Sequence, residues 1–318
     1  MNDTEVTNDT KKSMEYLLDE YERASQTVDG LYVPKRFPTE NVKSGMGYRA
    51  RDGDVAIITY PKSGTTWTQY IVSNLLYYDQ VNRDNESTPL HLCPFIESDG
   101  INILKLGGCH KAHLVFDVKR FNPRAKYIVV MRNPRDVCVS YYYHCMTLLP
   151  GTQVKPKGFF FPAFARLFIS NKIWYGDYFE HVRSWLEGPT ATGATGDNIL
   201  YVIYEKMKAN PRQELIRMAN FIGGEAAERV KDEKIVDVVL SRTSLKSMKE
   251  TLNPVMREHQ RNVRTAEETG SIIDNFEFVR KGQVGDWKNH FTPDISATFD
   301  AWIHANPENE KIMKLFEI

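Results

Sequence analysis

Apolar runs along this chain predict strands, each followed closely by a helix. The segments 54–60 (DVAIITY), 125–131 (AKYIVVM) and 198–205 (NILYVIYE) are largely apolar and rich in β-branched residues. Helix-forming stretches follow all three after short loops. Continuous apolar strands that alternate with helices are typical of a parallel sheet covered on both faces. The pattern therefore predicts an α/β fold with a mostly parallel sheet flanked by helices.

The N-terminal part of the chain has a different pattern. Apolar residues at helical spacing predict a short amphipathic helix over residues 13–24, after a frayed polar stretch. Gly and Pro interrupt residues 28–50, where we expect an irregular arm. No internal repeat or linker divides the sequence after residue 50. We predict an N-terminal tail with a short helix over residues 1–30 and a single domain over residues 31–318.

Charge and hydropathy exclude some classes of partner. The 318 residues include 41 Lys plus Arg and 41 Asp plus Glu, so the formal net charge is zero. A balanced charge gives no general attraction to nucleic acid or to an anionic membrane. The N-terminus lacks the apolar stretch of a signal peptide, and no run approaches the ~18 apolar residues of a membrane span. We expect a cytoplasmic protein that binds neither nucleic acid nor membrane.

The four cysteines show no pattern of a metal site. Cys93, Cys109, Cys138 and Cys145 form no CxxC pair and have no metal-ligand spacing. Buried free thiols in a reducing compartment are the simplest interpretation, with a disulfide or redox role as the alternative. We expect free thiols.

A glycine-containing loop between the first strand and its helix is the strongest chemical signal. It spans residues 59–67, TYPKSGTTW. Gly64 permits a tight turn, and the amides up to Trp67 would point to one place near the helix N-terminus, where anions bind. The loop residues that add a positive charge, an amide or a hydroxyl are Lys62, Ser63, Thr65 and Thr66. The loop predicts a P-loop-like phosphate site, although Lys precedes the glycine, unlike GxxxxGK[ST]. A capped helix after a strand is the structural alternative.

Two further places carry basic residues suited to a second phosphate. Arg132 follows the second strand, and Ser140 lies two helical turns later. Asn133 as N-cap and Pro134 in the first helical turn are also explained by helix structure alone. At residues 280–282 (RKG), two cations adjoin a glycine that allows close approach of an anion, with a solvated turn as the alternative.

Together these segments resemble the cytosolic sulfotransferase family over about residues 30–310. The resemblance rests on six segments in the family's order: TYPKSGTTW (59–67), KAHL (111–114), RNPRDVCVSYYYH (132–144), YEKM (204–207), TSLKSM (243–248) and RKGQVGDWKNHF (280–291). It implies transfer of a sulfuryl group from 3′-phosphoadenosine 5′-phosphosulfate (PAPS) to a small-molecule acceptor. The implied product is 3′-phosphoadenosine 5′-phosphate (PAP). We expect no metal, because the sequence shows no metal-ligand cluster and the fixed cations make one unnecessary.

The resemblance also implies the nucleotide-binding residues. The loop from Lys62 to Trp67 would hold the 5′-phosphosulfate, with Trp67 against the adenine. The residues implied for the 3′-phosphate are Arg132, Ser140, Arg280, Lys281 and Gly282. Those implied for the adenine pocket are Tyr204, Thr243 and Met248. Leu245 stands where the family often has an aromatic residue.

His113 lies at the position of the family's catalytic base. An imidazole of near-neutral pKa suits removal of the acceptor's proton as the new S–O bond forms. Lys62 is implied to stabilise the charge that grows on the leaving phosphate. We expect direct in-line transfer, in which positioning and electrostatics supply most of the catalysis.

The acceptor is the part that the sequence specifies least. The candidate pocket residues are Phe95, Lys111, His113 and Phe160. The triple phenylalanine at 159–161 is interpreted as a mobile lid, as core packing or as a contact with a partner. An aromatic pocket suits phenols, catechols or flat apolar alcohols. Among these classes and the amines, we expect the hydroxyl of a phenol or the amine of an aromatic amine to be the acceptor group.

Oligomeric state and two alternative functions stay open. The family's dimer pattern KxxxTVxxxE would begin at Lys288 and keep Thr292, but Pro293 and Ala297 depart from it, so a monomer or a homodimer is expected. A P-loop nucleotide kinase is disfavoured by the order of Lys and Gly in the loop. A non-catalytic PAP-binding protein is disfavoured because the chain retains both Lys62 and His113.

Overall fold

The structure is a computed structural model that divides into two compact units, each assembled from segments separated in sequence. It describes residues 7–81, 88–105, 108–149, 152, 158–192, 196–262 and 277–317. The first unit comprises Met1–Arg36, Asn133–Asp177 and Leu245–Lys314, and the second comprises Phe37–Arg132, Tyr178–Ser244 and Leu315–Ile318. The predicted division into a tail and a single domain stays a prediction.

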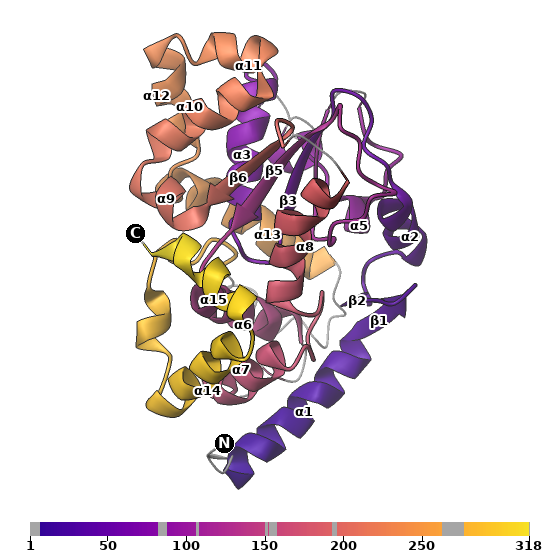
Figure 1. Ribbon diagram of the computed structural model, residues 1–318, viewed down its shortest axis with the longest axis vertical. Helices are drawn as coiled ribbons and strands as arrows, with labels where there is room; N and C mark the ends of the chain where they lie inside the picture. The colour runs from indigo at the N-terminus through magenta and orange to yellow at the C-terminus, as the bar shows by residue number, and fades with distance from the viewer. Residues whose placement is uncertain are drawn as a thin grey trace. The chain divides into compact units, whose positions relative to one another are not determined.

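A four-stranded parallel sheet lies at the centre of the second unit (Figure 1). Its strands, in spatial order, are β4 (Cys109–Ala112), β3 (Val55–Thr59), β5 (Lys126–Met131) and β6 (Ile199–Ile203). All three neighbouring pairs are parallel, and Ile57 lies opposite Lys111 on one side and Ile128 on the other. All residues of β3 are buried, as expected for a central strand. The predicted α/β fold with a parallel sheet is confirmed.

Helices cover both faces of this sheet. They are α2 (Thr39–Gly47), α3 (Thr65–Leu76), α4 (Pro89–Leu92), α5 (Ile96–Asp99), α8 (Tyr178–Ala191), α9 (Tyr204–Ala209), α10 (Pro211–Ile222), α11 (Gly224–Arg229) and α12 (Glu233–Arg242). Ile57 belongs to an apolar cluster with residues of α3, α10 and α12. Ile58 points to the opposite face and lines a small cavity of about 40 Å³ together with Trp185 of α8. Alternation along β3 therefore divides the core into two layers.

The N-terminal segment of the first unit is more regular than predicted. Helix α1 (Asn8–Ala24) begins earlier than residue 13, because the Thr7 side chain accepts a hydrogen bond from Thr10 N. The expected irregular arm contains an antiparallel hairpin of β1 (Ser25–Val28) and β2 (Leu31–Pro34), followed by α2. The two turn residues, Asp29 and Gly30, both have positive φ, at 47° and 86°. An Asp-Gly pair favours such a hairpin turn, and this signal was missed.

The rest of the first unit is helical and packs through aromatic side chains. Its elements are α6 (Pro134–Leu148), α7 (Phe161–Ile169), α13 (Leu245–Asn262), the 3-10 helix η3 (Asp286–Asn289), α14 (Pro293–His304) and α15 (Pro307–Met313). A further 3-10 helix, η4 (Lys314–Phe316), crosses the boundary between segments of the two units. Phe168 of α7 stacks on Phe299 of α14, with ring centres 6.0 Å apart. These contacts bury one face of α7 against α14.

The expectation of four free cysteines is wrong for two of them. Cys93 and Cys109 form a disulfide with Cα atoms 4.7 Å apart, whereas Cys138 and Cys145 are buried thiols. The cause is strand register. A parallel bridge joins Phe95 to Lys111 of β4. Cys93 and Cys109 each lie two positions before these residues, so the bridge places them opposite each other.

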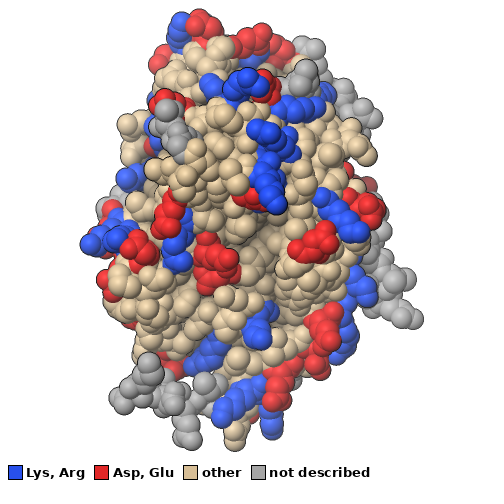
Figure 2. Space-filling model, turned by 45° about the vertical axis from the view of Figure 1, so that its right-hand side comes forward, with Lys and Arg blue, Asp and Glu red and all other residues tan. Residues whose placement is uncertain are grey.

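Charges of both signs are mixed on the surface. On the face drawn in Figure 2, Lys and Arg side chains lie among Asp and Glu side chains rather than in a separate area. Among the described helices, none is long and apolar enough to cross a membrane.

Candidate active site

The loop between β3 and α3 turns through two residues of positive φ, Lys62 at 67° and Gly64 at 112°. A non-glycine residue in this region costs about 1–2 kcal/mol, and such strain clusters at functional sites. Gly64 is also required for space, because a Cβ atom there would lie 2.8 Å from the Tyr204 ring. The backbone of this loop is therefore tightly determined.

The donors of the loop are only partly those expected. The amide of Ser63 donates to Tyr60 O at 3.2 Å and so closes the turn instead of facing a ligand. The Ser63 hydroxyl is buried and has no hydrogen-bond partner among the described residues. The first amides of α3 have no intrahelical acceptors and lie at the positive end of the helix dipole. These amides and the Ser63 hydroxyl suit a bound anion.

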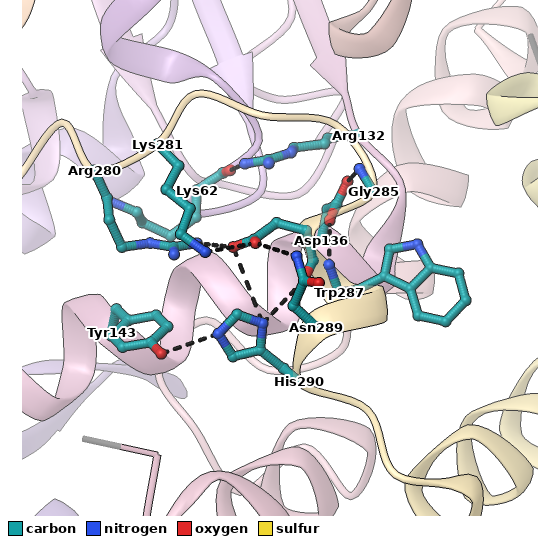
Figure 3. Close-up of polar contacts among 11 residues, drawn as sticks. Lys62, Arg132, Asp136, Tyr143, Arg280, Lys281, Gly285, Trp287, Asn289 and His290 are labelled. Atoms are coloured by element: carbon teal, nitrogen blue, oxygen red, sulfur yellow. Dashed lines mark hydrogen bonds and ion pairs between the residues drawn. The ribbon is translucent and has the colours of Figure 1, made fainter. Parts of the chain in front are cut away.

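Arg132 and two aromatic residues lie beside this loop. Arg132 is 7% exposed, and its Nη1 donates to Lys62 O at 3.2 Å (Figure 3). Its guanidinium carbon lies 4.3 Å from the centre of the Tyr204 ring. The Trp67 ring packs edge-on against Tyr204 with centroids 5.7 Å apart. The structure thus brings together four of the predicted nucleotide residues.

His113 follows β4 and is held against the end of β3. Its Nδ1 lies 2.8 Å from Thr59 O and 3.1 Å from Thr59 Oγ1. A carbonyl oxygen only accepts hydrogen bonds, so Nδ1 carries the proton and Nε2 is the basic nitrogen. Desolvation lowers the pKa of His113 to about 3, although the hydrogen bond to Thr59 opposes this shift. The neutral ring that a general base requires is therefore the stable form at neutral pH.

Thr59 connects this histidine to the anion loop. Its hydroxyl lies 2.6 Å from that of Thr65 as well as 3.1 Å from His113 Nδ1. Thr65 is buried, so its hydroxyl is engaged inside the protein and not only toward a ligand as predicted. Nothing in the sequence singles out Thr59 beyond its place at the end of the strand.

The candidate acceptor residues gather around His113. The Phe95 ring lies 4.9 Å from the His113 ring. Lys111 Nζ lies 5.4 Å from the centre of the Phe95 ring and donates to Gln69 Oε1 at 3.1 Å. Desolvation lowers the pKa of Lys111 to about 8, against the influence of nearby carboxyl groups. Three of the four residues predicted for the acceptor pocket therefore lie together.

Glu97 is a member of this cluster that the sequence did not indicate. Its Oε1 accepts a hydrogen bond of 2.6 Å from His113 N, and its Oε2 has no hydrogen-bond partner among the described residues. Burial raises the pKa of Glu97 to about 8, although the hydrogen bond from His113 N opposes the shift. A largely protonated carboxyl group thus fixes the backbone at His113 near neutral pH.

The first unit contains the other set of predicted residues. Arg280 Nη2 and Lys281 Nζ, whose residues are labelled in Figure 3, each lie 2.7 Å from a carboxylate oxygen of Asp286. Gly282 has φ 56°, and a Cβ atom there would lie 2.8 Å from the Leu245 side chain. The positive φ therefore favours glycine at this position, since the end of the Leu245 side chain could move aside for a Cβ atom.

Asp136 anchors the segment that carries these cations. It is 2% exposed and accepts hydrogen bonds from Gly285 N at 2.7 Å and Trp287 N at 3.0 Å (Figure 3). Ser140 lies one turn further along α6 and is half-buried. The sequence does not indicate this role of Asp136, because its partners lie 149 and 151 positions away.

Three further predicted residues, Met248, Thr243 and Phe160, are buried. Met248 lies in α13 of the first unit, and the Thr243 hydroxyl in the second unit donates to Val239 O at 2.8 Å. Phe160 is 4% exposed and stacks on Tyr16 of α1 with centroids 5.4 Å apart, which favours the core-packing interpretation.

The predicted nucleotide residues belong to both units. Those of the second unit are Lys62, Ser63, Gly64, Thr65, Thr66, Trp67, Arg132, Tyr204 and Thr243, and those of the first are Ser140, Met248, Arg280, Lys281 and Gly282. Among the described residues, no group of three or more His, Cys, Asp or Glu side chains is arranged to hold a metal ion. The expectation that the reaction requires no metal stays a prediction.

Comparison with known proteins identifies relatives over most of the chain. The family model of the sulfotransferase domain matches residues 52–316. The chain is 31% identical to Sulfotransferase 1E1 of Homo sapiens over 297 residues, which are 89% of this chain and 92% of that protein. It is 30% identical to an amine sulfotransferase of Oryctolagus cuniculus over 263 residues, 80% of each protein.

Two solved structures share the fold. A mouse sulfotransferase complexed with PAP aligns with a TM-score of 0.65 and 23% identity, over 92% of this chain and 99% of that one. A retinol dehydratase in complex with androsterone and the inactive cofactor PAP aligns with a TM-score of 0.66 and 18% identity, over 95% and 94%. At these identities the likeness extends to the fold alone.

Proposed function

Because this chain belongs to the sulfotransferase domain family, we propose that it transfers the sulfuryl group of PAPS to a hydroxyl or an amine of a phenol or aromatic amine. The observation that supports this most is the contact of Thr59 with both His113 and Thr65. It links a neutral imidazole to the first turn of a helix whose amides suit an anion. A base and an anion loop joined in this way serve transfer of a sulfuryl group from a phosphosulfate anhydride.

His113 is the proposed general base. Its Nε2 takes the proton of the acceptor hydroxyl as the acceptor oxygen forms a bond to sulfur. The bond between sulfur and the 5′-phosphate oxygen breaks in line, and its electron pair stays on that oxygen. Lys62 and the first amides of α3 stabilise the resulting charge, and PAP leaves. Atoms and charge balance without a metal ion.

The acceptor class follows from the side chains around His113. Phe95 provides an aromatic wall, and Phe37 packs edge-on against it with centroids 5.5 Å apart. Such walls suit a flat aromatic acceptor. The matched amine sulfotransferase supports an amine as a second acceptor group. We propose that the protein acts in the cytoplasm as a monomer or a homodimer. Arg280, Lys281 and Gly282 are the proposed ligands of the 3′-phosphate.

The proposal is tested by PAP release from PAPS with a panel of phenols, catecholamines, hydroxysteroids and long-chain alcohols. His113→Ala should abolish acceptor-dependent release, whereas His304→Ala, at an exposed histidine of α14, should leave it unchanged. Both variants should still bind PAP, and PAP at about 100 times its Kd should stabilise them by about 2.7 kcal/mol.

Substantial turnover by His113→Ala would remove this residue as the base. Stabilisation of the native protein by PAP without turnover of any acceptor would support the non-catalytic alternative. Preferential stabilisation by ATP with Mg²⁺ would support the nucleotide-kinase alternative. The family match favours neither alternative.

A further inference from the structure

The segment that carries Arg280 and Lys281 also carries the carboxylate that holds them. Asp286 is 2% exposed. Its Oδ2 accepts a hydrogen bond from Arg280 Nη2, and its Oδ1 accepts one from Lys281 Nζ, both at 2.7 Å. Asn289 Nδ2 donates to the same Oδ1 at 3.0 Å. One carboxylate thus fixes two long cationic side chains side by side.

Asp286 is itself held in place. It opens η3, where His290 Nδ1 lies 2.9 Å from its backbone oxygen. His290 Nε2 lies 2.9 Å from the Tyr143 hydroxyl, which links η3 to α6 (Figure 3). Asp136 holds the amides on both sides of Asp286. The carboxylate is therefore positioned by the backbone and is not a mobile counter-ion.

The ionised form of Asp286 is strongly favoured. Burial alone would raise its pKa, but hydrogen bonds from Lys281, Asn289 and Arg280 hold the pKa of Asp286 well below its usual range. The carboxylate is consequently charged wherever the protein is folded near neutral pH.

Both cations keep donors for a second anion. A guanidinium has five N–H donors and an ammonium has three. Within the described residues, Arg280 Nη2 and Lys281 Nζ each donate one hydrogen bond to Asp286. The Arg280 guanidinium also lies 4.4 Å from the centre of the Tyr143 ring, which limits its orientation. Without the carboxylate, the two adjacent cations would repel each other and turn toward solvent. Long side chains that are already immobile lose less entropy when a ligand binds.

We infer that Asp286 is a positioning residue that presents Arg280 and Lys281 to the 3′-phosphate of the nucleotide. The inference rests on the proposed function, because it takes these two cations as ligands of that phosphate. Asp286 acts only through them, so its removal should affect nucleotides that have a 3′-phosphate and spare those that lack one.

The test compares binding of PAP with binding of ADP, which lacks the 3′-phosphate, by titration calorimetry. Asp286→Asn keeps the size of the side chain and removes its charge. We expect the Kd of PAP to rise about tenfold or more, since charge-assisted hydrogen bonds orient both cations. The Kd of ADP should change less than about twofold. In turnover, KM for PAPS should rise while kcat at saturating PAPS stays within about threefold.

Asp294→Asn is the matched control. Asp294 pairs with Arg166 in the same unit and is 44% exposed, so the same chemical change there should leave both affinities unchanged. Asp286→Glu restores the charge and should recover part of the PAP affinity. Asp286→Glu also tests the inference if Asp286→Asn does not fold. Compared with the native protein, its affinity for PAP should be lower and its affinity for ADP should be unchanged.

Unchanged or tighter binding of PAP by Asp286→Asn would overturn the inference, and tighter binding would mean that Asp286 competes with the phosphate. An equal loss of affinity for PAP and ADP would also overturn it, because Asp286 would then support only the fold. A native protein that binds PAP no more tightly than AMP, which differs from PAP only in lacking the 3′-phosphate, would instead contradict the proposed 3′-phosphate site itself. The measurement on the native protein therefore separates failure of the proposed function from failure of this inference.

Discussion

Single residues around β4 owe their protonation states to burial. Desolvation lowers the pKa of His113 to about 3 and that of Lys111 to about 8, and it raises the pKa of Glu97 to about 8. His113 was predictable because it lies in a family motif. Glu97 was not predictable, because a carboxyl group in the polar segment IESD is expected to be solvated. Only the fold brings its side chain within hydrogen-bonding distance of His113 N. Local sequence identifies a reactive group but not the buried group that holds it.

The lowered pKa of His113 predicts the pH dependence of the reaction. A group whose pKa lies near 3 is neutral throughout the range from about pH 5 to about pH 7, so the base stays available there. We expect kcat/KM to be flat over this range and to change only near pH 8, where Lys111 and Glu97 titrate. The measurement is kcat/KM against pH at constant ionic strength. A fall in rate below about pH 6.5 would show that the imidazole is solvated in the free enzyme.

Whole elements were predictable to the extent that their stabilising contacts are local. The apolar runs of β3, β5 and β6 predicted three strands. Strand β4 was missed because it has only four residues, CHKA, of which two are polar. The disulfide was missed for a related reason: its two cysteines are aligned by strand pairing over a separation of 16 residues.

The anchoring of the 280–290 segment by α6 predicts a cost in stability. Asp136→Ala would leave the amides of Gly285 and Trp287 without their buried acceptor. Each such loss costs about 1–3 kcal/mol, so we expect the free energy of unfolding to fall by about 2–4 kcal/mol. Urea denaturation measures this change. Asp300→Ala is the control, because Asp300 is 51% exposed and its ion pair with Arg135 contributes little. Equal effects of the two variants would contradict the anchoring role.

At the scale of the whole molecule, the chain passes repeatedly between two units. Each unit is assembled from three segments that alternate along the sequence. The apolar pattern predicted the sheet of one unit but not this alternation. Periodicity shows whether a residue is buried, but it does not show which distant segments pack against it. Arg132 and Asn133, neighbours in one predicted motif, belong to different units for this reason.

The alternation predicts that both units unfold together. If the second unit unfolded alone, the segments of the first would be joined by long disordered loops. Closing a loop of about 100 residues costs on the order of 4 kcal/mol, which would destabilise the remaining unit. We expect calorimetric and van't Hoff enthalpies of unfolding to agree, with coincident transitions by tryptophan fluorescence and far-UV circular dichroism. Two separate transitions would show that the units are independently stable.

The stacking of Phe168 on Phe299 has a further consequence during translation. A ribosome that adds about 5–20 residues per second produces Phe299 on the order of ten seconds after Phe168. Through that interval the apolar face of α7 has no α14 to cover it, and it is open to holding chaperones or to another nascent chain. The yield of folded protein in a cell therefore depends on the pace of synthesis as well as on the contacts of the finished molecule.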